Sequence, residues 1–96
     1  MAIQSFSDVS TELFFKKGDV RKGVRWADVI KIARRKLDML HYAALLSDLK
    51  APPGNRLKRL KGNLIGNHSI RINDQWRILF IWSEAGPANV QITDYH

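Results

Sequence analysis

The segment Ile70-Arg71-Ile72-Asn73-Asp74-Gln75-Trp76-Arg77-Ile78 decides the fold of this chain. Apolar residues alternate with arginines on both sides of a polar triplet, which is typical of a β-hairpin with one buried face. A three-residue loop at 73–75 sets Arg71 opposite Arg77, and a shift by one residue would turn the apolar side chains to solvent. The apolar face then consists of Ile70, Ile72, Trp76, Ile78, Phe80 and Trp82.

Helix signals lie upstream of this hairpin. Ser7-Asp8 supplies an N-cap for a first helix, and Lys16-Lys17-Gly18 marks its C-terminus. Apolar residues then recur at helical spacing, which predicts a second, amphipathic helix at about 26–46. The prolines of Ala51-Pro52-Pro53-Gly54-Asn55 end the helical half of the chain.

Strand signals complete the expected fold. Residues 2–6 predict a short opening strand, residues 57–62 a short basic strand or edge, and residues 88–95 a last strand after a turn at 84–87. These elements predict an α+β fold, in which an N-terminal strand and two helices pack on one face of an antiparallel sheet. The other face is then free to be polar and to meet a ligand. The length predicts a single domain, residues 1–96.

The charge of the chain is unusual in its sign. Lys and Arg number 16 against 9 Asp and Glu, which gives a formal net charge of +7. The excess is spread over both halves of the chain, so the folded surface attracts polyanions such as RNA, DNA or an acidic protein. With no cysteine there is no disulfide, thiolate zinc site or cysteine nucleophile. No segment resembles a membrane span or a signal peptide, so we expect a cytoplasmic protein.

Three ionisable side chains end the chain: Asp94, Tyr95 and His96. Metal-free cleavage of RNA needs a base for the 2′-hydroxyl, an acid for the leaving oxygen and cations for the phosphate. If the last strand is paired into the sheet, we expect these three groups to lie within reach of the arginine-lined face of the hairpin. The cations available to such a site are Arg56, Lys58, Arg59, Lys61, Arg71 and Arg77.

Each of these features also has an ordinary structural explanation. Clustered lysines and arginines are most often solvated, Arg77 can be a structural arginine between apolar neighbours, and a C-terminal Tyr-His pair is more often disordered than catalytic. His68, at the start of a strand, is ambiguous. Other chemistries have less support, because the chain has no metal-ligand spacing, paired carboxylates, glycine-rich nucleotide loop or helix-turn-helix pair. We expect neither a metal nor a cofactor.

Four segments carry a specific resemblance: Pro52-Pro53-Gly54-Asn55-Arg56-Leu57, Leu60-Lys61-Gly62, the hairpin residues 69–78 and the ending Asp94-Tyr95-His96. Through them the chain resembles the HigB branch of the RelE/ParE toxin superfamily over essentially its whole length. The resemblance implies the small RelE-like α+β fold. It also implies a type II toxin–antitoxin system, whose toxin is a ribosome-dependent endonuclease that cuts mRNA in the ribosomal A site and halts translation.

The resemblance further implies partners and site residues. A HigA-type helix-turn-helix antitoxin neutralises the toxin, and operator DNA is bound only through their complex. The implied catalytic residues are Lys61, Arg77, Asp94, Tyr95 and His96, with RNA contacts expected from Arg56, Lys58, Arg59, His68 and Arg71. Lys58 stands where some members have a histidine, which removes one candidate base and leaves His96 or Asp94 as the proton acceptor. The separate assignment of general acid and general base stays open.

Two other functions stay open. One is a non-catalytic toxin that binds a protein target, as the gyrase-poisoning ParE toxins of the same superfamily do, and the other is a plain RNA-binding module. Changing His96 to Ala or Gln separates them. A nuclease loses mRNA cleavage and growth inhibition, a gyrase poison provokes DNA damage, and a pure binder keeps its affinity without yielding cut RNA.

Overall fold

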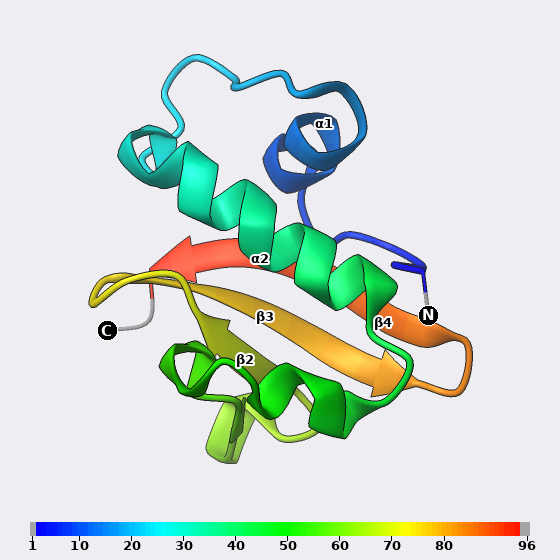
Figure 1. Ribbon diagram of the computed structural model, residues 1–96. Coiled ribbons are helices and arrows are strands. Elements are labelled where there is room, and N and C mark those ends of the chain that lie inside the picture. The colour runs from blue at the N-terminus through cyan, green and yellow to red at the C-terminus, as the bar shows by residue number, and fades with distance from the viewer. Residues whose placement is uncertain (1, 95–96) are drawn as a thin grey trace.

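A four-stranded antiparallel sheet organises the molecule, with its strands in chain order from one edge to the other. The computed structural model describes residues 2–94. Figure 1 shows helix α2 lying across one face of this sheet. The strands are β1 (Lys58–Arg59), β2 (His68–Arg71), β3 (Trp76–Ser83) and β4 (Gly86–Asp94).

The β2–β3 hairpin has the predicted three-residue loop. Arg71 pairs with Arg77 in the register of the two strands, and the Ile72 amide donates to the Trp76 carbonyl at 2.9 Å. The Asn73 carboxamide oxygen accepts from the backbone amides of Gln75 and Trp76, at 2.9 and 2.7 Å. This side-chain turn closes the loop, because an asparagine can replace the missing backbone acceptor.

The apolar face of the hairpin forms the core with α2 (Ile30–Tyr42). Side chains from both elements are fully buried, namely Ala33, Leu37, Leu40, Ile70, Ile78 and Phe80. The predicted buried face is therefore confirmed. The arrangement leaves the opposite face of the hairpin for the two arginines.

The second helix is shorter than the predicted range of 26–46. A 3₁₀ turn, η1 (Ala27–Val29), precedes α2, and after Tyr42 the chain is extended before a second 3₁₀ helix, η2 (Leu46–Lys50). The Asp48 carboxylate accepts from the amides of Ala44 and Leu45 at 3.0 Å each. This local acceptor satisfies donors that a continuous helix would have used, so the helix breaks there.

Helix α1 (Val9–Lys17) has the predicted caps, since Asp8 accepts from the Thr11 amide at 3.3 Å and Gly18 is left-handed with φ of 74°. The predicted opening strand is reduced to an extended segment with one parallel bridge, between Phe6 and Val90. The Thr11 hydroxyl accepts from the Ile92 amide at 3.1 Å. The segment and α1 thus cover the outer edge of β4, which would otherwise expose unpaired backbone groups.

A buried polar pair ties α2 to the loop that leads into β1. Lys36 donates to the Asn55 carboxamide oxygen, and the Asn55 amide group donates to the Leu49 and Ala51 carbonyls at 3.2 Å each. Burial, aided by the positive charge of Arg35, lowers the pKa of the Lys36 ammonium. The short helix η3 (Pro53–Asn55) therefore has a defined position against α2.

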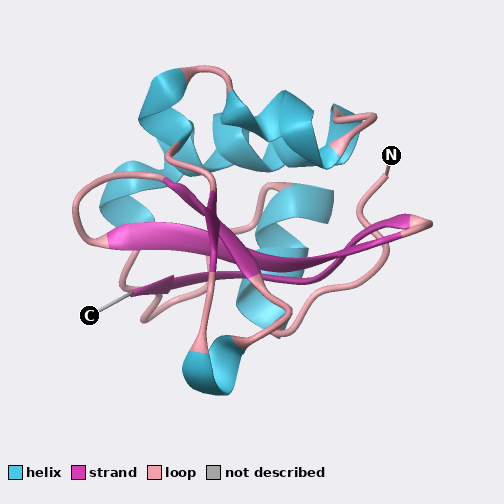
Figure 2. Ribbon diagram, turned by 90° about the horizontal axis from the view of Figure 1, so that it is seen from below, coloured by secondary structure: helices cyan, strands magenta, loops and turns pink. Residues whose placement is uncertain are grey.

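The helical segments are short. Within residues 2–94, none is long and apolar enough to cross a lipid bilayer. Figure 2, turned by 90° from Figure 1, shows most of the helical segments above the strands.

Candidate functional site

The face of the sheet away from α2 carries a row of polar side chains at one end. Arg77 pairs with Arg71 on β2 and with Thr93 on β4. Their strand neighbours Ile70 and Ile78 point into the core, so the row points to the opposite face. This end of the sheet also holds the β2–β3 loop and the end of β4 (Figure 1).

The two arginines form a cationic pair. Directly opposite residues have Cβ atoms about 4.5–5.5 Å apart, so the two side chains start from adjacent positions on this face. Arg71 is ion-paired with Asp74, whose side chain is 97% exposed. An ion pair with so exposed a carboxylate contributes little stability, so a phosphate can replace Asp74 as the partner of Arg71.

The rest of this face is less open than the sequence predicts. Lys58 pairs with Ser69, and Ser69 pairs with Leu79, which places all three on the same face as the arginines. Ser69 and Leu79 are buried, although the strand pattern assigns them to the face expected to be free. The accessible part therefore includes the arginine row and the Lys58 edge and is interrupted by these two buried side chains.

Asp94 lies on the opposite face of the sheet from Arg77, whereas the sequence led us to expect it within reach of the arginine-lined face. It pairs with Trp76, and its carboxylate accepts from the Gln75 side-chain amide at 3.0 Å. The Arg25 guanidinium lies 4.0 Å from the same oxygen and 5.8 Å from the centroid of the Trp76 ring. The carboxylate thus projects to the α2 side of the sheet, at the same end as the arginine row.

A β-bulge causes this reversal. Near the turn, Ile81 pairs with Ala88, whereas beyond the bulge Leu79 pairs with Gln91. Between these two pairs β4 therefore contains one residue more than β3. Asn89 lies in the bulge with φ of 52°, a left-handed conformation that asparagine tolerates better than most residues. Without the extra residue, Asp94 would have faced the same way as Arg77. The other two predicted terminal residues, Tyr95 and His96, lie outside the described residues.

Strand alternation also divides the basic segment at 56–61. Lys58 shares the face of the arginine row, whereas Arg59 pairs with His68 on the α2 side. Arg56 is exposed in a left-handed conformation with φ of 46°. Lys61 precedes the short helix η4 (Gly62–Leu64). The predicted RNA-contacting cations therefore form two groups on opposite faces of the sheet rather than one cluster.

His68 lies on the α2 side of the sheet, with its ring stacked on Phe80 at a centroid distance of 5.9 Å. Burial lowers the pKa of the imidazole, and the positive charge of Arg59 lowers it further. His68 is therefore neutral at pH 7, and it can form hydrogen bonds but adds no charge to a phosphate site. Its buried Nδ1 atom has no hydrogen-bond partner among residues 2–94.

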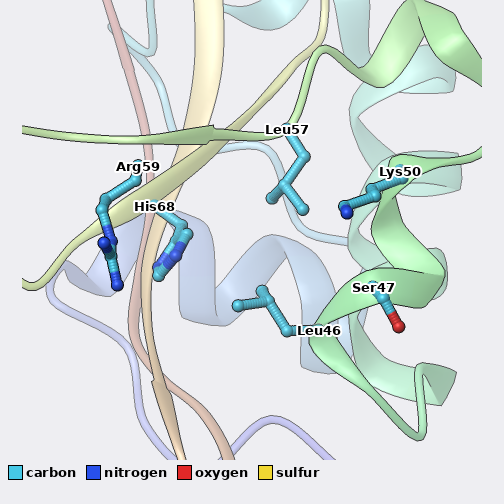
Figure 3. Close-up of a pocket in the computed structure, with 6 residues that line it drawn as sticks. All are labelled: Leu46, Ser47, Lys50, Leu57, Arg59 and His68. Atoms are coloured by element: carbon cyan, nitrogen blue, oxygen red, sulfur yellow. The ribbon is translucent and has the colours of Figure 1, made fainter.

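Two clefts flank the Arg59–His68 pair. One, of about 430 Å³, lies against η2, and the residues that line it are Leu46, Ser47, Lys50, Leu57, Arg59 and His68 (Figure 3). The other, of about 490 Å³, is lined by Arg59, Leu60, Lys61, Ile65, Gly66 and His68. No group of three or more potential metal ligands occurs in the described part of the chain.

The contacts of Arg25 and Gln75 with Asp94 were not predicted from the sequence. Gln75 belongs to the hairpin loop, and only the pairing of β3 with β4 brings this loop to the end of the chain. Arg25 belongs to the irregular segment before η1, which carries no local signal of its position. Both contacts depend on the bulge that sets the register of β4.

Comparison with known proteins identifies relatives over nearly the whole chain. The family model of the RelE-like toxin of the type II toxin–antitoxin system HigB matches residues 4–96. The chain is 38% identical over 92 residues to Toxin HigB-1 of Vibrio cholerae serotype O1, with 96% of this chain and 95% of the relative covered. It is 31% identical over 77 residues to an uncharacterised protein of Haemophilus influenzae, with 80% and 75% covered.

Solved structures of low sequence identity share the fold. A YoeB–YefM complex from Staphylococcus aureus matches with a TM-score of 0.55 and 17% identity, covering 100% of this chain and 99% of that chain. A heterotetrameric YoeB–YefM toxin–antitoxin complex from the same organism matches with a TM-score of 0.54 and 16% identity over the same shares. Because the HigB-like model spans residues 4–96 and a HigB toxin is 38% identical, the chain belongs to the HigB-like family of RelE-like type II toxins.

Proposed function

We propose that this toxin is a metal-independent endoribonuclease that cleaves mRNA in the ribosomal A site and so inhibits translation. The observation that carries the proposal is the Arg71–Arg77 pair on the sheet face away from the core, at the end of the sheet where β4 ends at Asp94. Membership of the HigB-like family supports the same conclusion. The toxin would act in the cytoplasm, where ribosomes and mRNA are found.

In the proposed reaction a base removes the proton of the 2′-hydroxyl, and the resulting oxygen attacks the adjacent phosphorus. The bond from phosphorus to the 5′-oxygen breaks, an acid protonates that oxygen, and a 2′,3′-cyclic phosphate remains. Arg77, Arg71 and Lys61 would stabilise the extra negative charge of the transition state. The proposed proton carriers are Asp94, Tyr95 and His96, whose separate roles as acid and base we leave open. The Asp94 carboxylate projects to the α2 side, so it would act on a phosphate held by the arginines only around the end of the sheet.

Further cations would guide the RNA. Lys58 lies on the face of the arginine row, and Arg56 and Arg59 are exposed beside it along the chain, whereas neutral His68 can contribute a hydrogen bond. The net charge of +7 favours docking to ribosomal RNA, and this attraction weakens as salt is added. The ribosome would supply much of the substrate positioning.

The proposal includes a protein partner. A helix-turn-helix antitoxin of the HigA type would neutralise the toxin, and operator DNA would be contacted only through the complex of the two proteins. The solved relatives are complexes of YoeB with YefM, which supports a protein partner for this fold.

Primer extension on translated mRNA tests the proposal. The wild-type toxin should yield cuts aligned with codons, and Arg77→Ala and His96→Gln should lose them while keeping a cooperative thermal transition. Lys31→Ala, an exposed change on α2, is the matched control and should leave the cuts intact. Toxicity without codon-aligned cuts, above all with DNA damage, would refute the nuclease and favour a protein target such as gyrase.

A further inference from the structure

The cleft between η2 and the edge strand β1 shares Arg59 and His68 with the proposed RNA-guiding surface, whereas its other lining residues, Leu46, Ser47, Lys50 and Leu57, have no role in the proposed nuclease reaction. We propose that it docks an extended, acidic peptide segment through one apolar anchor side chain, and that the antitoxin supplies this segment. The inference rests on the proposed function only for the identity of the partner, because the docking chemistry requires no RNA cleavage.

The centre of the cleft is apolar. Figure 3 shows Leu46 and Leu57 between the two polar walls, and both side chains are half-buried and pack against the core. A cleft of about 430 Å³ has room for one large aliphatic or aromatic side chain. Burying such a side chain against two leucines releases ordered water and favours association.

The two ends of the cleft are cationic. Lys50 stands on the η2 side and Arg59 on the β1 side, and both residues are exposed. Two carboxylates that flank an apolar anchor would meet these charges on either side of it. A second copy of this chain is a poor occupant, because each copy carries a net charge of +7 and the copies repel one another.

His68 provides a neutral polar contact in the same wall. Its lowered pKa leaves the imidazole uncharged at pH 7, and because Nδ1 is buried, only Nε2 can meet a peptide, where it donates or accepts one hydrogen bond according to the tautomer. A peptide backbone offers both kinds of partner. Since β1 is the last strand on this side of the sheet, an extended segment can lie alongside it.

A nucleotide fits the cleft less well than a peptide. Nucleobases bind on exposed aromatic faces and through polar groups at their edges. One face of the His68 ring is stacked on Phe80, and the leucines offer neither an aromatic surface nor a hydrogen bond. The observations therefore favour an apolar side chain flanked by carboxylates.

Fluorescence anisotropy with two labelled peptides tests the proposal on the full chain. One probe is a short Glu- and Asp-rich peptide with a single central leucine, and the other has serine in place of that leucine. The wild-type chain should bind the leucine peptide about tenfold more tightly, because the anchor is buried only in that complex. Raised salt should weaken both peptides and leave their ratio in place, since only the charge attraction is screened.

Variants outside the proposed nuclease machinery locate the binding. Ser47→Trp fills the cleft without changing charge and should abolish the difference between the two peptides. Lys50→Glu should weaken both peptides more than Lys17→Glu, an equal charge change at the end of α1. Thermal melts establish that each variant is folded.

Three results would overturn the proposal. The first is equal affinity of the wild-type chain for the two peptides, and the second is a difference in affinity between the peptides that persists in Ser47→Trp. The third is a short RNA that binds the wild-type chain more tightly than the leucine peptide does and no longer binds Ser47→Trp. None of these readouts involves cleavage. A wild-type chain that fails to cut mRNA would refute the nuclease function and leave the peptide measurements unaffected.

Discussion

Asn55→Ala tests the buried polar pair that holds the loop before β1. Asn55 is fully buried and Lys36 is 8% exposed, so water does not freely replace their contacts. The substitution deletes the acceptor of the Lys36 ammonium and the donors to the Leu49 and Ala51 carbonyls. The fold should survive, with the free energy of unfolding strongly reduced.

The expected loss follows from these three hydrogen bonds. Each neutral bond to a carbonyl contributes about 1 kcal/mol, and the bond from a charged donor about 1.5–3 kcal/mol, so their loss lowers the free energy of unfolding by about 4 kcal/mol. The total free energy of unfolding of a domain of this size is roughly 5–15 kcal/mol. The variant should be only marginally stable, with a Tm lower by on the order of 20 °C.

Urea unfolding of four proteins measures this loss: the wild type, Asn55→Ala, Lys36→Met and the double variant. Lys36→Met removes the buried ammonium. In the Lys36→Met background, Asn55→Ala should therefore lower the free energy of unfolding by less than it does in the wild type, with a coupling free energy of about 1.5 kcal/mol or more. Asn55→Asp, which keeps an acceptor for Lys36 and loses both donors, is the matched control. A loss below about 1 kcal/mol for Asn55→Ala, or strict additivity of the two changes, would refute the reasoning.

Three further predictions concern single side chains. His68 should have a pKa below 6.5, the ordinary value of a histidine, in NMR titrations, and Arg59→Gln should raise that pKa. Because the pKa of His68 is lower in the folded chain, the unfolded chain takes up the proton first as the pH falls. The free energy of unfolding should therefore decrease as the pH is lowered from 6.5 to the folded pKa. His68→Gln should remove this decrease. Thr11→Val should lower the free energy of unfolding by about 1–3 kcal/mol in urea titrations, because it strands a buried β4 amide; an unchanged midpoint would contradict this. Gln75→Leu should slow single-turnover mRNA cleavage about threefold through the loss of a hydrogen bond to Asp94, and Gln75→Glu should slow it further by repulsion; equal rates would show that this contact does not position the carboxylate.

Local chemistry in the sequence was sufficient for the hairpin and the first helix. The alternation through Ile70–Ile78 admits one register that buries every apolar side chain, and the structure has that register. Asp8 and Gly18 bound α1, because the first offers an oxygen to free amides and the second adopts a left-handed conformation at little cost. The motifs quoted from the sequence also led to the correct toxin family.

A competing side-chain acceptor and long-range contacts decided the rest. The break after α2 depends on Asp48, whose carboxylate competes with the helix for backbone amides, and the clefts beside β1 combine residues distant in the sequence. The direction of Asp94 depends on one inserted residue near Asn89, since a shift of one position reverses every side chain of a strand. The sequence alone therefore supplied the residues proposed for the chemistry, and the pairing of β3 with β4 determined that Arg77 and Asp94 lie on opposite faces of the sheet.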